Sequence, residues 1–300
     1  MSGSAGTLRA YATLLRVPNL ATAPPDVLLG AALVAPVADI RLAPLAGLCV
    51  ASVLLYAGGT TLNDYVDAAE DARERPERPI PSGEVSRTAA LAVGLSFLVC
   101  GVAVAAATKP QSGGVAAALT ACILLYDGVF KHRPVGVVFM GGARGLNVLL
   151  GVSLGGALLD LSPIVLVVPA VVFVYIAAVT FMAAGETVGD NRGAVALAIG
   201  AVALAGLAVV VRLGVRSPGL AATALTFVLV ACFLAWTGQA LRRAYLTPRP
   251  ETVGPAVGTC VLAQVVLDGA FASTVGPAWG LATVGLLVPA VGLSRVFDVS

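Results

Sequence analysis

The chain is dominated by long apolar runs, each about as long as a helix that crosses a membrane. Such a helix needs roughly 20 mostly apolar residues to cross about 30 Å of hydrocarbon. Runs of this kind recur along most of the sequence, and short polar stretches separate them. The pattern predicts ten membrane-spanning helices, at 18–37, 43–66, 87–107, 113–130, 135–158, 162–185, 193–211, 218–241, 254–273 and 277–294.

The ninth predicted span is the weakest, because Gln264 and Asp268 interrupt its apolar run. If that segment is broken or re-entrant, the chain has nine crossings. Ten crossings place Arg295 on the same side as the other basic segments, so we expect ten.

The composition agrees with this membrane pattern. Hydrophobic residues make up 58% of the chain and charged residues only 11%, with a mean hydropathy of +0.96. Soluble domains carry about 25% charged residues, so an ordinary soluble protein is excluded. The net charge of +2 is too small to indicate a nucleic-acid partner. We predict an all-α, polytopic bundle of nine to ten helices, with residues 1–300 forming one integral membrane domain.

Basic residues are distributed unequally between the two sides of this predicted bundle. If the helices alternate across the bilayer, thirteen lysines and arginines fall on one side and four on the other, with Arg144 inside a span. Cytoplasmic segments carry the excess of basic residues. The richer side includes the two longer polar segments, 67–87 and 242–253. We therefore predict a cytoplasmic active site in a bacterial-type plasma membrane.

A first acidic cluster follows the second predicted span. Asp64, Asp67 and Asp71 lie at i, i+3 and i+7, so on a helix they share one face, with Asn63 beside them. Mg²⁺ takes oxygen ligands from one or two carboxylates, water and substrate phosphates. Such a face therefore suits a magnesium ion bridging to a diphosphate. The alternative is a solvated loop, since other acidic and basic residues alternate between Glu70 and Arg78.

A second acidic cluster follows the sixth predicted span, on the same membrane side. Glu186 and Asp190 are at i and i+4, again on one helical face. Two carboxylate clusters at matching depth indicate a pair of metal sites around one polyanionic group. Arg78, Lys131 and Arg192 lie on that side and could hold phosphate oxygens, although the positive-inside rule alone also accounts for basic residues there.

These motifs resemble those of the UbiA superfamily of intramembrane prenyltransferases. "NDYVDAAED" matches its NDxxDxxxD signature, and "RPIPSG" at 78–83 looks like its RPxPSG element. "YDGVFK" at 126–131 is similar to the family's segment after span four. "GETVGD" stands where the family's second acidic motif follows span six. The resemblance covers most of the chain in order and spacing, and the first motif with its tail is the most specific part.

The sequence also departs from the family pattern. The second motif begins with Glu186 where the family has aspartate, and the longer side chain could shift a metal ligand. The family commonly has nine spans. "LRVPNLATAPPDVLLG", "GGARGLN" and "VVLDG" look similar to the EboC-like branch.

The resemblance implies Mg²⁺-dependent transfer of an isoprenyl group from a prenyl diphosphate to a small acceptor in the membrane, with release of diphosphate. In that interpretation the first acidic motif lies within 63–71, its loop is 72–86, and the second motif is 186–190. The expected catalytic metal ligands are Asp64, Asp67, Asp71, Glu186 and Asp190. The expected substrate-binding residues are Asn63, Arg78, Lys131, Arg144, Asn147, Arg192 and Tyr126.

Several polar residues lie inside predicted spans, where they are costly and therefore functional candidates. Arg144 and Asn147 are at i and i+3, and they could bind a substrate head group or pair with Asp26 or Asp268. A structural ion pair that fixes helix packing is an equal alternative. Asp127 precedes Lys131 by four residues and could orient that lysine.

Two other functions fit parts of the pattern. A terpene cyclase of the same family would use the same motifs on the prenyl diphosphate alone. A membrane transporter would place charges near the midplane between repeats, whereas these aspartates lie at one membrane face. The sequence does not identify the acceptor or the prenyl chain length.

Overall fold

The computed structural model describes the backbone of residues 2–35, 39–160, 162–184 and 191–296. Helices and the turns between them make up this described part of the chain, with no strand in it. The all-α prediction is therefore confirmed.

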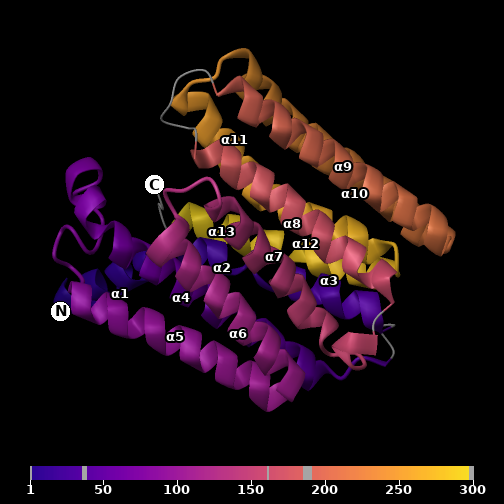
Figure 1. Ribbon diagram of the computed structural model, residues 1–300, viewed down its shortest axis with the longest axis horizontal. Helices are drawn as coiled ribbons and strands as arrows, with labels where there is room; N and C mark the ends of the chain where they lie inside the picture. Colours follow the sequence, from indigo (N-terminus) through magenta and orange to yellow (C-terminus); the bar gives the residue numbers. More distant parts are fainter. Residues whose placement is uncertain (1, 36–38, 161, 185–190, 297–300) are drawn as a thin grey trace.

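The helices follow one another with short connections (Figure 1). The first half contains α1 (Ser2–Leu14), α2 (Val17–Leu20), α3 (Pro24–Val34), α4 (Leu42–Glu74), α5 (Arg87–Thr108), α6 (Pro110–Leu125), the π-helix η2 (Tyr126–Phe130) and α7 (Gly136–Val152). The second half contains the short 3-10 helix η3 (Leu158–Asp160), α8 (Pro163–Ala184), α9 (Arg192–Arg216), α10 (Leu220–Leu246), α11 (Pro250–Ser273), α12 (Pro277–Gly285) and α13 (Leu287–Val296).

The predicted spans correspond to helical segments of the structure. Among the described residues, eight segments are long and apolar enough to cross a membrane, and 136–152 and 277–293 are shorter apolar helices. The suspected ninth span is the continuous helix α11, and 72% of its apolar window is buried inside the bundle. The interruption lies instead between α12 and α13. Pro289 lacks an N–H group and its ring clashes with the carbonyl four residues earlier, which ends the α-helix there.

Helix α3 lies at the centre of the bundle and packs against α4, α7 and α11. Its contact with α7 is close because two glycines face the opposite backbone. A Cβ atom on Gly30 would lie 2.0 Å from the Val148 carbonyl oxygen, and one on Gly151 would lie 2.1 Å from the Val27 carbonyl oxygen. Small residues allow membrane helices to approach in this way when no hydrophobic driving force acts between them. This packing brings polar residues of α3, α4, α7 and α11 together.

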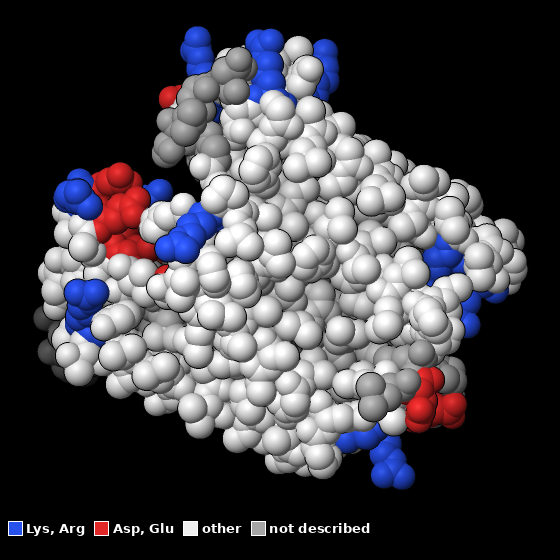
Figure 2. Space-filling model, viewed as in Figure 1, with Lys and Arg blue, Asp and Glu red and all other residues white. Residues whose placement is uncertain are grey.

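The charged residues on the visible surface gather at two opposite ends of the bundle (Figure 2). One group lies at the upper left and top, where the loop after α4 and the α10–α11 connection are found (Figure 1). The other lies at the right and lower right, and a broad uncharged surface separates the two. Helix α13 packs against α2 near the start of the chain.

Candidate active site

The first acidic motif lies on one face of α4, as the spacing predicted. Asp64 and Asp71 are buried and Asp67 is partly buried, whereas Glu70 and Glu74 are exposed. Helix α4 continues to Glu74, so the loop begins three residues later than the expected residue 72. The helix therefore carries the whole motif and holds its three aspartates in one row.

Each of these aspartates is paired with a cation from elsewhere in the chain. Arg78 Nη1 lies 2.9 Å from Asp71 Oδ2 and 3.5 Å from Asp64 Oδ1. Arg16 Nη2 lies 2.9 Å from the same Asp64 oxygen. The Lys131 ammonium is paired with Asp67. The like-charge repulsion along the face is thus balanced by three basic residues that the helix itself does not supply.

Arg78 is positioned by a compact loop between α4 and α5. Gly83 in this loop has a φ of +79°, a conformation that favours glycine. The loop is anchored where Val85 packs with Leu14 of α1 and Ala90 of α5 in a small separate cluster. The RPxPSG segment therefore lies against the N-terminal helix and returns Arg78 to the acidic face.

Arg16 was not predicted as a site residue. It lies between α1 and α2 in a left-handed conformation with a φ of 49°, which costs about 1–3 kcal/mol in a residue other than glycine. Burial lowers the pKa of its guanidinium, but Asp64, Tyr56 and Asp67 together raise it by more, so the net pKa is above its ordinary value. Arg16 therefore stays charged at the acidic face, and the surrounding structure compensates for its strained backbone.

The end of the fourth span contains a π-helix that changes which residues meet. Tyr126–Phe130 form η2, with a wider turn than an α-helix. We expected Asp127 to orient Lys131, because residues four apart share one face of an α-helix. The π-helix does not have this spacing, and each of the two residues contacts α4 instead. Asn63 Nδ2 instead donates to Asp127 Oδ1 at 2.9 Å, and Lys131 reaches Asp67. The π-helix and the lysine that follows it thereby contact α4 at two points.

A cavity of about 640 Å³ opens beside these residues. Arg16, Asn63, Asp127 and Lys131 line it at the end near the acidic face. Its walls are mostly apolar and come from α4, α6, α7, α8 and α11, with Leu55, Ile123, Met140, Ile176 and Val257 among them. The cavity therefore combines a charged end with apolar walls.

Further along the cavity, Arg144 forms an ion pair with Asp26. Arg144 Nη1 lies 3.1 Å from Asp26 Oδ2 and donates to the Thr22 carbonyl oxygen at 3.0 Å. Asn147 Nδ2 donates to the same Asp26 oxygen at 2.8 Å, and Gln264 Nε2 donates to Asp26 Oδ1 at 2.7 Å. Of the two partners considered from sequence, Asp26 is the one that binds Arg144. This buried network joins α3, α7 and α11.

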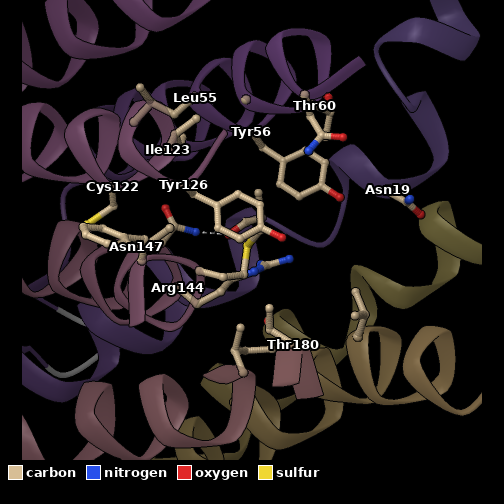
Figure 3. A pocket seen from close by; sticks show the side chains of 18 of the residues that line it. Asn19, Leu55, Tyr56, Thr60, Cys122, Ile123, Tyr126, Arg144, Asn147 and Thr180 are labelled. Carbon is tan, nitrogen blue, oxygen red and sulfur yellow. Dashed lines mark hydrogen bonds between the residues drawn. The ribbon is translucent and has the colours of Figure 1, made fainter. Parts of the chain in front are cut away.

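Tyr56 is a second residue that the sequence reasoning missed. Its ring lies beside Arg144, with the guanidinium carbon 5.6 Å from the ring centroid. Figure 3 shows Tyr56, Tyr126 and Arg144 directed into the same space. Tyr56 could have been found from spacing, because it lies seven residues before Asn63 and so shares its face of α4. The signal for Arg16 was weaker, since only the folded chain places the residue near Asp64.

The remaining predicted residues are not part of this described arrangement. Glu186 and Asp190 lie outside the described residues. Arg192 begins α9 and is exposed, and it is not among the residues that line the cavity.

The oxygen ligands of the acidic face suit a hard divalent cation. Within the described ranges no three histidine, cysteine or acidic residues form a metal-binding group. Asp64 and Asp71 nevertheless converge on one cationic atom, Arg78 Nη1. Mg²⁺ needs only one or two protein carboxylates when water and phosphate complete its octahedron. The residues present therefore fit this ion.

The model of the UbiA prenyltransferase family matches residues 25–253, which is more than half of the chain. The chain belongs to this family. The predicted resemblance is confirmed, and the matched range contains the acidic motif, the RPxPSG loop, Asp26 and Arg144.

Several curated relatives of this UbiA chain have the same name. Digeranylgeranylglyceryl phosphate synthase from Methanoregula boonei is 36% identical over 197 residues, which cover 62% of this chain and 64% of the relative. The enzyme of that name from Methanopyrus kandleri is 34% identical over 151 residues, with 49% and 54% covered. The chain thus spans less than two thirds of the length of these relatives.

Solved structures have the same fold as this UbiA chain. A UbiA homolog from Archaeoglobus fulgidus bound to GPP and Mg²⁺ superimposes with a TM-score of 0.64 at 18% identity, covering 92% of this chain and 99% of that one. A UbiA homolog from Aeropyrum pernix K1 gives 0.65 at 17% identity, with 84% and 96% covered. At these identities the likeness establishes the fold alone.

Proposed function

We propose that this protein is a Mg²⁺-dependent prenyltransferase, which moves an isoprenyl group from a prenyl diphosphate to a small acceptor within the membrane. One observation carries the proposal. Arg16 and Lys131 line one end of the cavity, where they pair with Asp64 and Asp67 of the acidic face, and the other walls are mostly apolar. This is the distribution that a molecule with a diphosphate head and a hydrocarbon tail requires.

The diphosphate would bind at the charged end. Lys131, Arg78 and Arg16 supply N–H donors that form strong charge-assisted bonds with phosphate oxygens. In the structure these donors are held by Asp67, Asp71 and Asp64. When diphosphate enters, the cations can turn to it while the aspartates take the metal, so neither set of charges is left unpaired.

Mg²⁺ would be held by Asp64, Asp67 and Asp71, with Glu186 and Asp190 forming the second site. Bound there, it would offset the negative charge that develops on the departing diphosphate. The A. fulgidus homolog carries GPP and Mg²⁺, which supports this choice of ion and of substrate class. Asn63 assists by fixing Asp127 beside the same end of the cavity.

In the transfer step, the bond between C1 and the diphosphate oxygen breaks and its electron pair leaves with diphosphate. Lys131 and Arg78 stabilise that charge. An acceptor nucleophile gives its electron pair to C1 and releases its proton. Tyr126 presents an aromatic ring to the cavity, where it can stabilise positive charge on the allyl group. The apolar walls exclude water that would otherwise capture this cation.

We place the charged end of the bundle in the cytoplasm. Segments 67–87 and 242–253, which contain the loop after α4 and the α10–α11 connection, carry seven of the thirteen basic residues counted on the predicted inner side. A prenyl diphosphate made in the cytoplasm would then reach the cavity directly.

The test is product analysis. The purified protein is incubated with Mg²⁺ and prenyl diphosphates of several lengths, with and without a membrane-free metabolite extract, and products are identified by mass spectrometry. A prenylated acceptor and free diphosphate are expected only when the extract is present. A cyclic hydrocarbon formed without extract would instead identify a terpene cyclase. Unchanged prenyl diphosphate in every reaction would exclude both enzymes and leave transport to be tested.

A further inference from the structure

Arg144 lies away from the diphosphate end of the cavity. It lies beside Tyr56, and its neighbour Asn147 accepts a hydrogen bond from Ser52 at 2.8 Å. Tyr56 precedes Asn63 by seven residues on α4, which corresponds to about 10 Å along the helix at 1.5 Å per residue. Arg144 is therefore a second polar position in a cavity whose other walls are mainly apolar.

The guanidinium of Arg144 is held firmly on one side and faces the cavity on the other. Its Nη1 is bound to the Thr22 carbonyl and to Asp26, and Nη2 lies 3.5 Å from the Thr22 hydroxyl. An arginine has five N–H donors, and these contacts do not use all five of them. Its side chain is 13% exposed, and the residue lines the cavity. The remaining N–H groups can thus reach a bound molecule.

The residues around Arg144 fix its position and have little capacity for other contacts. Both ends of the Asn147 amide are engaged by Ser52, Ala23 and Asp26. Asp26 accepts from Arg144, Asn147 and Gln264 and is fully buried. Asn147, Asp26 and Gln264 are therefore positioning residues, and Arg144 is the one that can touch a ligand.

The charge of Arg144 is already balanced by the Asp26 carboxylate. Asp26 pairs with it directly, and Asp268 on α11 is close enough to interact electrostatically with both. Asp268 is fully buried. A phosphate or carboxylate beside this group would add uncompensated negative charge inside the bundle, which is strongly unfavourable. A neutral oxygen would accept from the guanidinium at no such cost.

Building on the proposed function, we infer that Arg144 binds the acceptor through a neutral hydroxyl or carbonyl oxygen and holds the acceptor's nucleophile toward C1 of the prenyl group. The acceptor is then small, with no more than about 10 Å between its nucleophile and this oxygen. The name of the curated relatives, digeranylgeranylglyceryl phosphate synthase, indicates a product with a phosphate group. The acceptor inferred for this chain differs because the part that Arg144 binds is uncharged.

The first experiment measures binding of geranyl diphosphate with Mg²⁺. Arg144→Gln is expected to change its Kd by less than about twofold, whereas Lys131→Ala weakens it by about tenfold or more through loss of a charge-assisted bond. Because Arg144→Gln leaves Asp26 without its cation, the double variant Asp26→Asn/Arg144→Gln is measured beside it. Equal weakening by the folded Arg144 variants and by Lys131→Ala would overturn the inference, because Arg144 would then belong to the diphosphate site.

The second experiment divides the metabolite extract by anion exchange and assays both fractions with wild-type protein. Prenylated product is expected from the unretained, neutral fraction. With that acceptor, Arg144→Gln raises KM by about tenfold or more while kcat stays within about threefold, and Arg144→Lys recovers part of the loss. No product from the neutral fraction, or an unchanged acceptor KM in the variant, would contradict the inference alone. A wild-type protein that binds no prenyl diphosphate would overturn the proposed function and this inference with it.

Discussion

Arg78 Nη1 lies 2.9 Å from Asp71 Oδ2, so the loop after α4 returns its arginine to the helix that it has just left. The same nitrogen lies within 3.5 Å of Asp64. One cation thus occupies the position where two motif carboxylates converge. In the proposed mechanism, diphosphate and Mg²⁺ replace these contacts: Arg78 binds the diphosphate, and Asp64 and Asp71 bind the metal ion. Each role can be tested by substitution.

Replacement of a motif aspartate is expected to abolish transfer without preventing folding. Asp67→Ala removes a proposed metal ligand, and we expect turnover to fall by about a hundredfold or more. Diphosphate release at increasing Mg²⁺ measures the loss. Glu70→Ala on the exposed side of the same helix is the matched control and should retain wild-type activity. Full prenyl transfer by Asp67→Ala would contradict the assignment of the acidic face.

Arg78 is expected to contribute to prenyl diphosphate binding. Arg78→Gln removes a donor worth about 1.5–3 kcal/mol, which corresponds to a rise of about ten- to a hundredfold in the KM for prenyl diphosphate. Arg75→Gln, in the exposed part of the same loop, serves as the control and should leave KM unchanged. An Arg78→Gln enzyme with wild-type KM would mean that the loop only neutralises Asp64 and Asp71.

The second acidic motif is expected to be as necessary as the first. Asp190→Ala should abolish diphosphate release while the protein still inserts and folds, which is checked by size-exclusion elution and helical circular dichroism. Glu251→Gln alters an exposed carboxylate at the start of α11 and should be neutral. Retained transfer by Asp190→Ala with Mg²⁺ would remove the second metal site from the mechanism.

The close contact of α3 and α7 is expected to be required for stability. Gly151→Val places side-chain atoms against the Val27 backbone, where even a Cβ atom would lie 2.1 Å from the carbonyl oxygen. Overpacking of this kind costs about 1–3 kcal/mol or more, so the unfolding temperature in detergent should fall clearly. Gly156→Ala has no atom within 4 Å of its new Cβ and should leave that temperature unchanged.

The orientation of the bundle can be tested by cysteine labelling. In a background without the five native cysteines, Glu77→Cys lies in the exposed loop after α4 and Arg41→Cys lies before the start of α4. A membrane-impermeant maleimide added to intact cells should label Arg41→Cys alone. After lysis it should label both. Labelling of Glu77→Cys in intact cells would place the proposed active site outside the cell.

Much of this architecture could be read directly from the sequence. The apolar runs determined the membrane helices, because a run of about 20 apolar residues is a local property that needs no tertiary partner. The spacing of Asp64, Asp67 and Asp71 determined their common face, since helical periodicity is local as well. The charged loop with Arg78 was also located correctly, although the end of α4 was misplaced by a few residues.

Only the tertiary structure decided which charges meet. Arg16 and Asp64 are 48 residues apart, and Arg144 and Asp26 are 118 residues apart. Helix packing, not local periodicity, brings such pairs together. The π-helix at Tyr126–Phe130 likewise redirected Lys131 to Asp67. Sequence therefore determined the spans and the acidic row, because these depend on neighbours along one helix. The cavity, its ion pairs and the position of Arg144 were decided by how α3, α4, α7 and α11 pack against one another.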